Sequence, residues 1–378
     1  MSLDMGYRKF VRALVIFIAL LVPANLLVWE LHTKKFFDDY DTAVMGDLAR
    51  LGYMPEYGVR KDHTQGRHPG LIFFNEYNGQ PVDMVVVGDS FSMGVGGGAH
   101  SFFQEHIIVN SGKRDFTVLS LIDPRDTAIE VIWKLLNTGI LEKINPRYVL
   151  IESAERASVE NFGLKRIDPG LAGSVEQLTA LLKKGGELAG LEREGKALEE
   201  NKPFFRFMTF ANLKHPLYKA LYMITDRPPG ASVYKARLDR PLFSSDYPET
   251  LLYLDADIHR MALVSEANVS MLNRNMNALS DALALKGIKL YFMPPPDKYG
   301  LYAPYIMDNR MPLSPFFALM RKQDRRYGFI DAGEILSEAL GEGVRDLYHQ
   351  DDTHWSWKAP DLIFRKFRFE PLLETPGR

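Results

Sequence analysis

The chain of 378 residues contains no cysteine. This absence excludes disulfide bonds, thiolate metal sites and cysteine nucleophiles together. An excess of either charge is missing as well, because 46 basic and 48 acidic residues leave a formal net charge of −2. Without a broad basic surface, nucleic acid is a poor partner, and we expect none. The histidines show no clear metal-ligand spacing, so we expect neither a metal nor another cofactor.

Apolar residues are abundant, at 46% of the chain. One run, from Ala13 to Trp29, contains no charged residue. About 17 residues at 1.5 Å each span roughly 25 Å, near the lower limit for crossing a bilayer. Arg8, Lys9 and Arg12 precede the run, which predicts that this end stays in the cytoplasm. We therefore expect a single-pass anchor in the bacterial inner membrane, with the rest of the chain in the periplasm. A cleaved signal peptide and a buried soluble helix are the alternatives.

Short apolar runs alternate with helical patterns after the anchor. Five of these runs are typical of strands buried on both faces: Met84–Val87, Phe116–Leu119, Tyr148–Ile151, Gly287–Met293 and Gly328–Ile330. The alternation predicts an open α/β sheet with parallel strands. Residues 163–265 interrupt it and are expected to form a mainly helical insertion. The predicted division is an anchor over 1–35, a lead-in segment over 36–80 and a main domain over 81–378.

The segment Gly88-Asp89-Ser90-Phe91-Ser92 directly follows the first predicted strand. Open α/β sheets bind ligands outside the carboxyl ends of their strands. A serine there can expose its hydroxyl while its backbone N–H faces a developing oxyanion, and Gly88 permits the tight turn. The alternative is that Asp89 and Ser90 only cap the next helix.

A second motif, Asp351-Asp352-Thr353-His354-Trp355, lies near the C-terminus. A serine hydroxyl is a weak nucleophile until a base takes its proton. Histidine can do so near neutral pH, and a carboxylate then stabilises the imidazolium. The motif supplies both groups on one segment. The alternative is a solvated acidic loop in which His354 merely packs.

Together the two motifs resemble the SGNH hydrolase superfamily, and in detail the branch related to alginate and other exopolysaccharide O-acetyltransferases. The resemblance covers residues 80–365 outside the insertion, including Ile151–Arg156 and Pro296–Tyr302. It implies a flavodoxin-like three-layer fold around a parallel central sheet. It also implies a catalytic triad of Ser90, His354 and Asp352, in which Ser90 carries the acyl group. General SGNH hydrolases place the acid three residues before the histidine, so Asp351 remains an alternative.

The resemblance further implies groups around this triad. Gly112 is the candidate for the family's glycine oxyanion donor. No asparagine donor follows the strand that ends at Ile151, and Arg156 stands there instead. Arg156 is a candidate to bind the oxyanion or the substrate, unless it only pairs with Glu155. Four other side chains are expected to line the acceptor cleft or to wall the site: Lys298, Tyr299, Tyr302 and Trp355.

The activity that the resemblance implies is transfer of an acyl group, acetyl above all, to or from a cell-surface polysaccharide or exopolysaccharide. Because acetyl-CoA is confined to the cytoplasm, an exported transferase needs a multi-spanning membrane acyltransferase as its donor partner. Alginate-type enzymes carry Asp-x-His-Trp before their serine, whereas here the serine comes first, so alginate itself is not implied. The alternatives are a catalytically inactive polysaccharide-binding or export scaffold and a simple acetylesterase.

Overall fold

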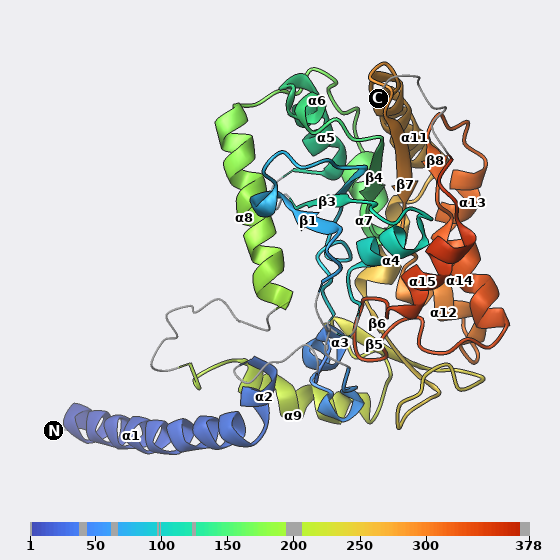
Figure 1. Ribbon diagram of the computed structural model, residues 1–378. Coiled ribbons are helices and arrows are strands. Elements are labelled where there is room, and N and C mark those ends of the chain that lie inside the picture. Colours follow the sequence, from blue (N-terminus) through green and yellow to red (C-terminus); the bar gives the residue numbers. More distant parts are fainter. Residues whose placement is uncertain are drawn as a thin grey trace.

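The computed structural model describes residues 2–37, 44–61, 67–96, 98, 100–122, 126–193 and 206–370. Within these residues a six-stranded sheet has the order β1-β3-β2-β4-β7-β8, and helices cover both of its faces (Figure 1). Every neighbouring pair of strands in it is parallel, which confirms the predicted α/β class. The strands are β1 (Leu71–Phe73), β2 (Met84–Val87), β3 (Val118–Leu121), β4 (Tyr148–Glu152), β7 (Lys289–Met293) and β8 (Gly328–Phe329).

The strand order reverses at β2. The chain passes from β2 to β3 on one side and then crosses to β4 on the other side. Helix α4 (Phe103–Asn110), which connects β2 to β3, packs on one face of the sheet. Helices α5 (Ala128–Asn137) and α6 (Ile140–Ile144), which connect β3 to β4, pack on the other. Because ligands bind at the carboxyl end of such a switch strand, the topology points to the residues just after Val87.

Alternate residues of the strands feed two hydrophobic clusters. Met84 and Val86 join the cluster under α4, α14 (Ala332–Gly341) and α15 (Lys358–Lys366). Val85 and Val87 join the cluster under α5 and α11 (Glu266–Ala284). A strand that buries both faces needs no polar alternation, which explains its continuous apolar sequence.

The other helices of the body are α3 (Asp47–Leu51), α7 (Glu155–Phe162), α8 (Val175–Arg193), α9 (Ala211–Tyr222), α10 (Ala256–His259), α12 (Lys298–Tyr302) and α13 (Phe316–Arg321). It also has the short 3-10 turns η2 (Pro55–Tyr57), η3 (Phe74–Glu76), η4 (Arg260–Leu263) and η5 (Ala303–Tyr305).

Two segments differ from the sequence-based expectation. Residues 71–73, within the predicted lead-in, form the edge strand β1, which is too short to show a periodicity. Within the predicted insertion, α8 packs against the sheet through Leu178 and Leu182 and so belongs to its helical cover. The later part of the insertion contains an antiparallel pair of strands, β5 (Val233–Arg237) and β6 (Thr250–Leu254), in addition to its helices, and the sequence pattern did not indicate these strands.

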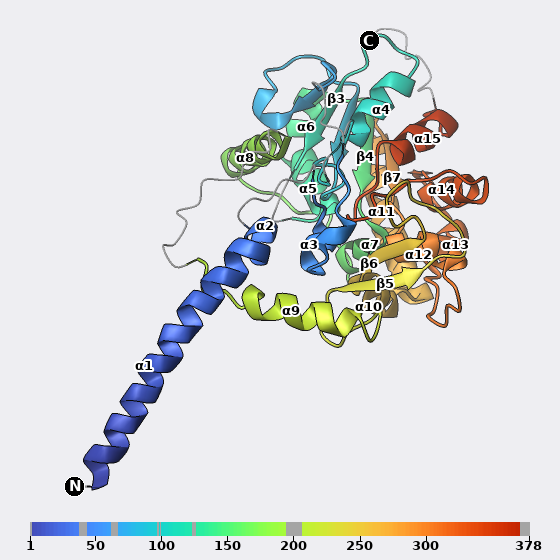
Figure 2. The same cartoon turned by 90° about the horizontal axis from the view of Figure 1, so that it is seen from below.

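The N-terminal helix α1 (Ser2–Val28) continues through a π-helical turn, η1 (Trp29–Thr33), into α2 (Lys34–Phe37). In the described part of the chain, one helical segment is long and apolar enough to cross a membrane, and it covers Gly6–Phe36. Its most apolar stretch is exposed rather than buried in the protein, which does not fit a core helix. Figure 2 shows α1 projecting from one side of the body.

Candidate active site

Ser90, His354 and Asp352 meet at the carboxyl end of β2. The Nε2 atom of His354 lies 2.8 Å from Ser90 Oγ, although the two residues are 264 positions apart. The Nδ1 atom of His354 lies 2.6 Å from Asp352 Oδ1. Both distances are those of hydrogen bonds. The row of hydroxyl, imidazole and carboxylate is the arrangement in which a histidine can accept a serine proton.

Burial and the neighbouring charge shift the pKa of His354 in opposite directions. Burial by itself lowers the pKa of His354, but the charge and hydrogen bond of Asp352 outweigh it, so the pKa is raised. Burial likewise favours protonation of Asp352, but the charge and hydrogen bond of His354 hold its pKa below the usual range. The pair is therefore arranged to stabilise an imidazolium beside a carboxylate.

The structure separates the two candidate acids. Asp352 faces the histidine, whereas Asp351 faces the segment that follows α2. Its Oδ2 accepts hydrogen bonds from the N–H groups of Gly46, at 2.7 Å, and Val59, at 3.0 Å. Its Oδ1 lies 3.2 Å from the Nζ atom of Lys61 in a buried ion pair. Asp352 thus has the position of the triad acid, and Asp351 ties the loop to residues 46–61.

Asp47 is a member of the site that the sequence did not suggest. Its carboxylate accepts hydrogen bonds from the N–H of Thr353, at 2.7 Å, and from its hydroxyl, at 2.6 Å. The backbone N–H of Asp47 in turn donates to Asp352 Oδ2 at 3.1 Å. Burial, and next the charge of Asp352, raise the pKa of Asp47. No local motif marks this residue, because its partners lie about 300 residues further along the chain.

Asp47, Asp352 and His354 also form a group whose ligand atoms all lie within 4.8 Å of one another. Such a group could hold a cation. Here, however, both ring nitrogens of His354 are engaged with Asp352 and Ser90. The Asp47 carboxylate is engaged with Thr353. The hydrogen bonds therefore account for the cluster as a support for the loop.

Two acidic side chains hold the turn that carries Ser90. Asp89 Oδ2 accepts a hydrogen bond from the N–H of Ala154, just after β4, at 2.8 Å. Glu152, buried at the end of β4, accepts at Oε2 from the Asp89 N–H at 3.0 Å and from the Ser92 hydroxyl at 2.8 Å. Burial, then the charge of Asp89, raise the pKa of Glu152 well above its ordinary value. The turn is thus fixed to the neighbouring strand by a carboxyl group that favours its neutral form.

The backbone N–H of Ser90 makes no hydrogen bond to any residue that the structure describes, so it is available to an oxyanion. Gly112 is not placed to assist it. Its neighbour Lys113 pairs at 3.1 Å with Asp83, directly before β2, so Gly112 lies at the amino end of the sheet and not near Ser90. Two other glycines approach the triad: an added Cβ would lie 2.7 Å from Asp352 Cβ at Gly46 and 3.0 Å from His354 Cβ at Gly96. At Gly96 a positive φ of 103° also favours glycine.

Arg156 lies at the start of α7 but is held by aspartates. Its Nη1 atom lies 3.1 Å from Asp297 Oδ1 and 3.7 Å from Asp257 Oδ1. The alternative partner, Glu155, instead accepts a hydrogen bond from the Asp297 N–H at 3.0 Å. The charge of Arg156 still reaches the site, where it opposes protonation of His354.

Lys298, Tyr299 and Tyr302 are all buried and do not line an open cleft. Lys298 Nζ donates hydrogen bonds to three carbonyl groups of the loop: those of His349 at 2.6 Å, Gln350 at 2.8 Å and Asp352 at 2.9 Å. Burial lowers the pKa of Lys298 to about 7. The function of this lysine in the structure is to hold the loop that carries His354.

The two tyrosines and Trp355 support the same region by packing. Tyr302 accepts a hydrogen bond from the Tyr348 N–H at 3.3 Å, and Tyr299 is bonded to Asn309. Trp355 is buried edge-on against Phe91, with ring centroids 4.9 Å apart, and so walls the triad from the inside.

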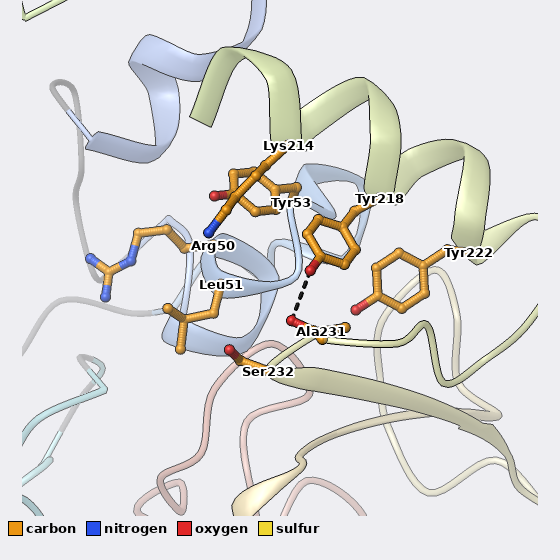
Figure 3. A pocket seen from close by; sticks show the side chains of 9 residues that line it. Arg50, Leu51, Tyr53, Lys214, Tyr218, Tyr222, Ala231 and Ser232 are labelled. Carbon is orange, nitrogen blue, oxygen red and sulfur yellow. Dashed lines mark hydrogen bonds between the residues drawn. The ribbon is translucent and has the colours of Figure 1, made fainter. Parts of the chain in front are cut away.

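Among the described residues, one cavity borders α3 and another borders the loop of His354. The cavity in Figure 3, between α3 and α9, is lined by Arg50, Tyr53, Lys214 and Tyr218 among others and includes no residue of the triad. A larger cavity borders the loop of His354. It is lined by Arg60, Gly98, His349, Gln350, Trp357 and Lys358, among others.

A scan of known protein-family models finds none that matches this chain, and a search of curated proteins finds no similar sequence.

Proposed function

We propose that the protein is an SGNH-type acyltransferase that moves an acyl group, acetyl above all, to or from a cell-surface polysaccharide or exopolysaccharide. One observation carries the proposal: the unbroken row from Ser90 Oγ through His354 to Asp352, with distances of 2.8 and 2.6 Å, at the carboxyl end of the switch strand β2.

In the first step, His354 Nε2 takes the proton of Ser90 as its oxygen attacks the acyl carbonyl of the donor. Asp352 stabilises the imidazolium, and the Ser90 N–H donates to the oxyanion. The proton then passes from His354 to the leaving group, which departs and leaves an acyl ester on Ser90. In the second step, His354 takes a proton from a sugar hydroxyl or water, whose oxygen attacks the carbonyl of the ester. The bond from the acyl carbon to Ser90 Oγ then breaks, the proton passes from His354 back to Ser90 Oγ, and the acyl group leaves on the sugar or as the free acid.

The basic residues in the first turns of α1, before its apolar run, support an orientation with the N-terminus in the cytoplasm and the body in the periplasm. Because acetyl-CoA does not cross the membrane, the donor is a multi-spanning membrane acyltransferase that passes acetyl groups outward. The anchor holds the acceptor enzyme beside that partner, which raises the effective concentration of the donor.

The larger cavity is the place where we expect the glycan to bind. It borders His349 and Gln350 in the loop of His354. Trp357, whose residue surface is 42% exposed, offers an indole face on which a sugar ring can stack. Lys358, which lines the same cavity, is paired with Asp346 at 3.0 Å, so Arg60 is the lining residue that favours an acceptor with carboxylate or phosphate groups.

The test is release of acetate from an activated acetyl ester by the full chain in lipid nanodiscs. We expect Ser90→Ala and His354→Ala each to reduce the rate to background, while Ser337→Ala, on the exposed side of α14, leaves it unchanged. An acceptor oligosaccharide that diverts acetyl from water to sugar separates a transferase from a simple esterase. A wild-type rate equal to background, or rates unchanged in both variants, would contradict the proposal.

The alternative of an inactive polysaccharide-binding scaffold is favoured by one feature, the missing asparagine donor after β4, where residues 153–156 are Ser, Ala, Glu and Arg. A scaffold binds glycan equally well with Ser90→Ala and shows no acetate release. The same nanodisc samples decide between the two functions.

A further inference from the structure

Helix α9 and its flanking residues present an apolar face to solvent. Phe210 is 83% exposed, Leu213 67% and Leu217 51%. Met223 and Ile224, at the C-terminal end of the helix, are 85% and 83% exposed. Residues 210, 213, 217 and 224 recur at the spacing of one helix face. Single exposed apolar residues are ordinary on a protein surface, but a continuous group of this kind marks a surface that is covered in use.

The opposite face of α9 is fixed to the body. The ring of Tyr218 stacks on Tyr53, with centroids 6.0 Å apart, and its hydroxyl donates to the Gly230 carbonyl at 2.7 Å (Figure 3). The Tyr222 hydroxyl donates to the Val233 carbonyl at 2.6 Å. With these contacts in place, α9 cannot turn its apolar face inward.

The same helix is attached to the end of α1. Asn212 Nδ2 donates to the Asn25 carbonyl at 3.1 Å and to its side-chain oxygen at 3.0 Å. The rings of His215 and His32 stack with centroids 4.9 Å apart. Figure 2 shows α9 running crosswise from the C-terminal end of α1, along the side of the body from which α1 projects.

An apolar groove lies between the two helices. It is lined by Leu21, Ala24 and Val28 of α1 and by Met208, Phe210 and Leu213 beside or within α9. Leu21 to Val28 are the last two turns of the apolar run that we propose to span the bilayer. Residues that share a groove with those turns lie at the same depth.

From this shared depth we infer that α9 is an interfacial helix, with its apolar face in the outer leaflet of the bilayer that α1 crosses. Amphipathic helices of this kind bury their apolar face at the boundary of headgroups and acyl chains. Lys214, which is exposed on α9 beside the cavity of Figure 3, carries a positive charge that fits anionic lipid headgroups. The inference rests on the proposed membrane span of α1 and is independent of the proposed chemistry.

This second attachment has a mechanical consequence. A single spanning helix leaves the body free to tilt about its exit point. Two attached helices, α1 crossing the membrane and α9 lying in its surface, hold the body in one orientation. The stacking of Tyr218 in α9 on Tyr53, just after α3, then sets the height of the triad above the membrane, because α3 begins with Asp47, which contacts Thr353.

The absence of cysteine makes a direct test possible, because one introduced cysteine is a unique labelling site. The full chain, carrying Leu217→Cys labelled with bimane, is placed in phosphatidylcholine–phosphatidylglycerol nanodiscs that contain doxyl lipids. We expect the Leu217 probe to be quenched several-fold more by doxyl lipid than a probe at Lys219→Cys, on another side of the same helix. A probe at Leu285→Cys, between α11 and β7 at the amino edge of the sheet, is expected to be quenched only by aqueous iodide.

A probe at Phe17→Cys, within α1, separates the possible failures. If Phe17 is quenched by lipid but Leu217 behaves like Leu285, α1 spans the bilayer and the interfacial position of α9 is wrong. Another protein would then be the occupant of its apolar face. If neither Phe17 nor Leu217 contacts lipid, both the anchor and this inference are overturned. Neither result depends on acetate release, so failure of the proposed chemistry is distinguishable.

Discussion

The turn of residues 88–92, here the nucleophile turn, and the loop of residues 349–355, here the base loop, are held by different means. The nucleophile turn continues a strand and is bonded to the end of the neighbouring strand through Glu152 and Ala154. The base loop is bonded to segments far away in the chain, through Lys298 and through residues 46–61. The sheet therefore positions the serine, whereas side chains from distant segments position the histidine.

This difference brings residues 46–61 into the site. Asp351 accepts hydrogen bonds from Gly46 and Val59, and Asp47 accepts two from Thr353. Residues 46–61 follow the proposed membrane helix in the chain. The base loop is thus bonded to the segment that follows the N-terminal helix, while the nucleophile turn is bonded to the end of β4 and, through Gln104, to α4.

The largest effect that tests the comparison concerns the two neighbouring aspartates. Asp352→Asn is expected to lower kcat by about 10⁴-fold with the fold intact, because the amide cannot stabilise the imidazolium. Asp351→Asn keeps the triad and weakens the tie to residues 46–61, so we expect a loss of about 1–3 kcal/mol in the free energy of unfolding and a smaller loss of rate. Kinetics and urea unfolding of both variants check this. A larger kcat loss in Asp351→Asn would reassign the acid.

Replacing Lys298 should disturb the base loop without touching the nucleophile turn. Lys298→Met leaves three buried carbonyl groups without their donor, and we expect a loss of about 2–4 kcal/mol in unfolding free energy together with reduced kcat. Lys322→Met, at an exposed lysine after α13, is the matched control. Thermal unfolding and acetate release measure the two effects. An unchanged melting temperature in Lys298→Met would show that the loop is held by other contacts.

The pH dependence sharpens the comparison further. Only neutral His354 can accept the serine proton, so kcat/KM should rise with pH through a midpoint above the ordinary histidine pKa of 6.5. Asp352→Asn removes the negative charge that opposes the effect of burial on the pKa of His354. The midpoint of the variant should therefore lie at a lower pH than that of wild type. A pH–rate profile of each protein measures both values, and a wild-type midpoint below 6.5 would contradict the raised pKa.

The same shift has a consequence for stability. A pKa raised on folding means that the folded state binds the proton of His354 more tightly than the unfolded state does. Its contribution to stability is therefore complete below the unfolded pKa near 6.5 and is lost as pH rises through the folded value. The lowered pKa of Asp352 has the opposite sign, so its contribution is present above the unfolded pKa and is lost on acidification.

The smallest effect is expected in the nucleophile turn. The raised pKa of Glu152 favours the neutral acid, and glutamine is neutral as well. Glu152→Gln therefore leaves the charge at this position unchanged and keeps an acceptor for the Asp89 N–H and the Ser92 hydroxyl. We expect acetate release within about threefold of wild type and less than about 1 kcal/mol of lost stability. Glu152→Leu, which removes the acceptor, should cost about 1–3 kcal/mol. Equal losses in both variants would mean that the carboxylate is charged.

Much of the sheet was predictable because strands that are buried on both faces have continuous apolar sequences. Met84–Val87 and Tyr148–Ile151 agree with β2 and β4 to within one residue. The edge strand β1 could not be predicted from its three residues, and the predicted strand at Phe116 begins two residues later, at Val118. Edge strands and element ends depend on tertiary contacts, which local patterns do not contain.

By itself, the sequence determined the class of sheet, the apolar helix at the N-terminus and the two motifs that supply a serine and an acid–histidine pair. Each is a local pattern of residue types, and local patterns follow from the geometry of strands, helices and turns. Only the tertiary structure decided that Asp352 and not Asp351 faces His354, that Asp47 supports the base loop, and that Lys298 is buried beneath it. Those assignments depend on contacts between residues about 50 to 300 positions apart, and such contacts exist only once the chain is packed.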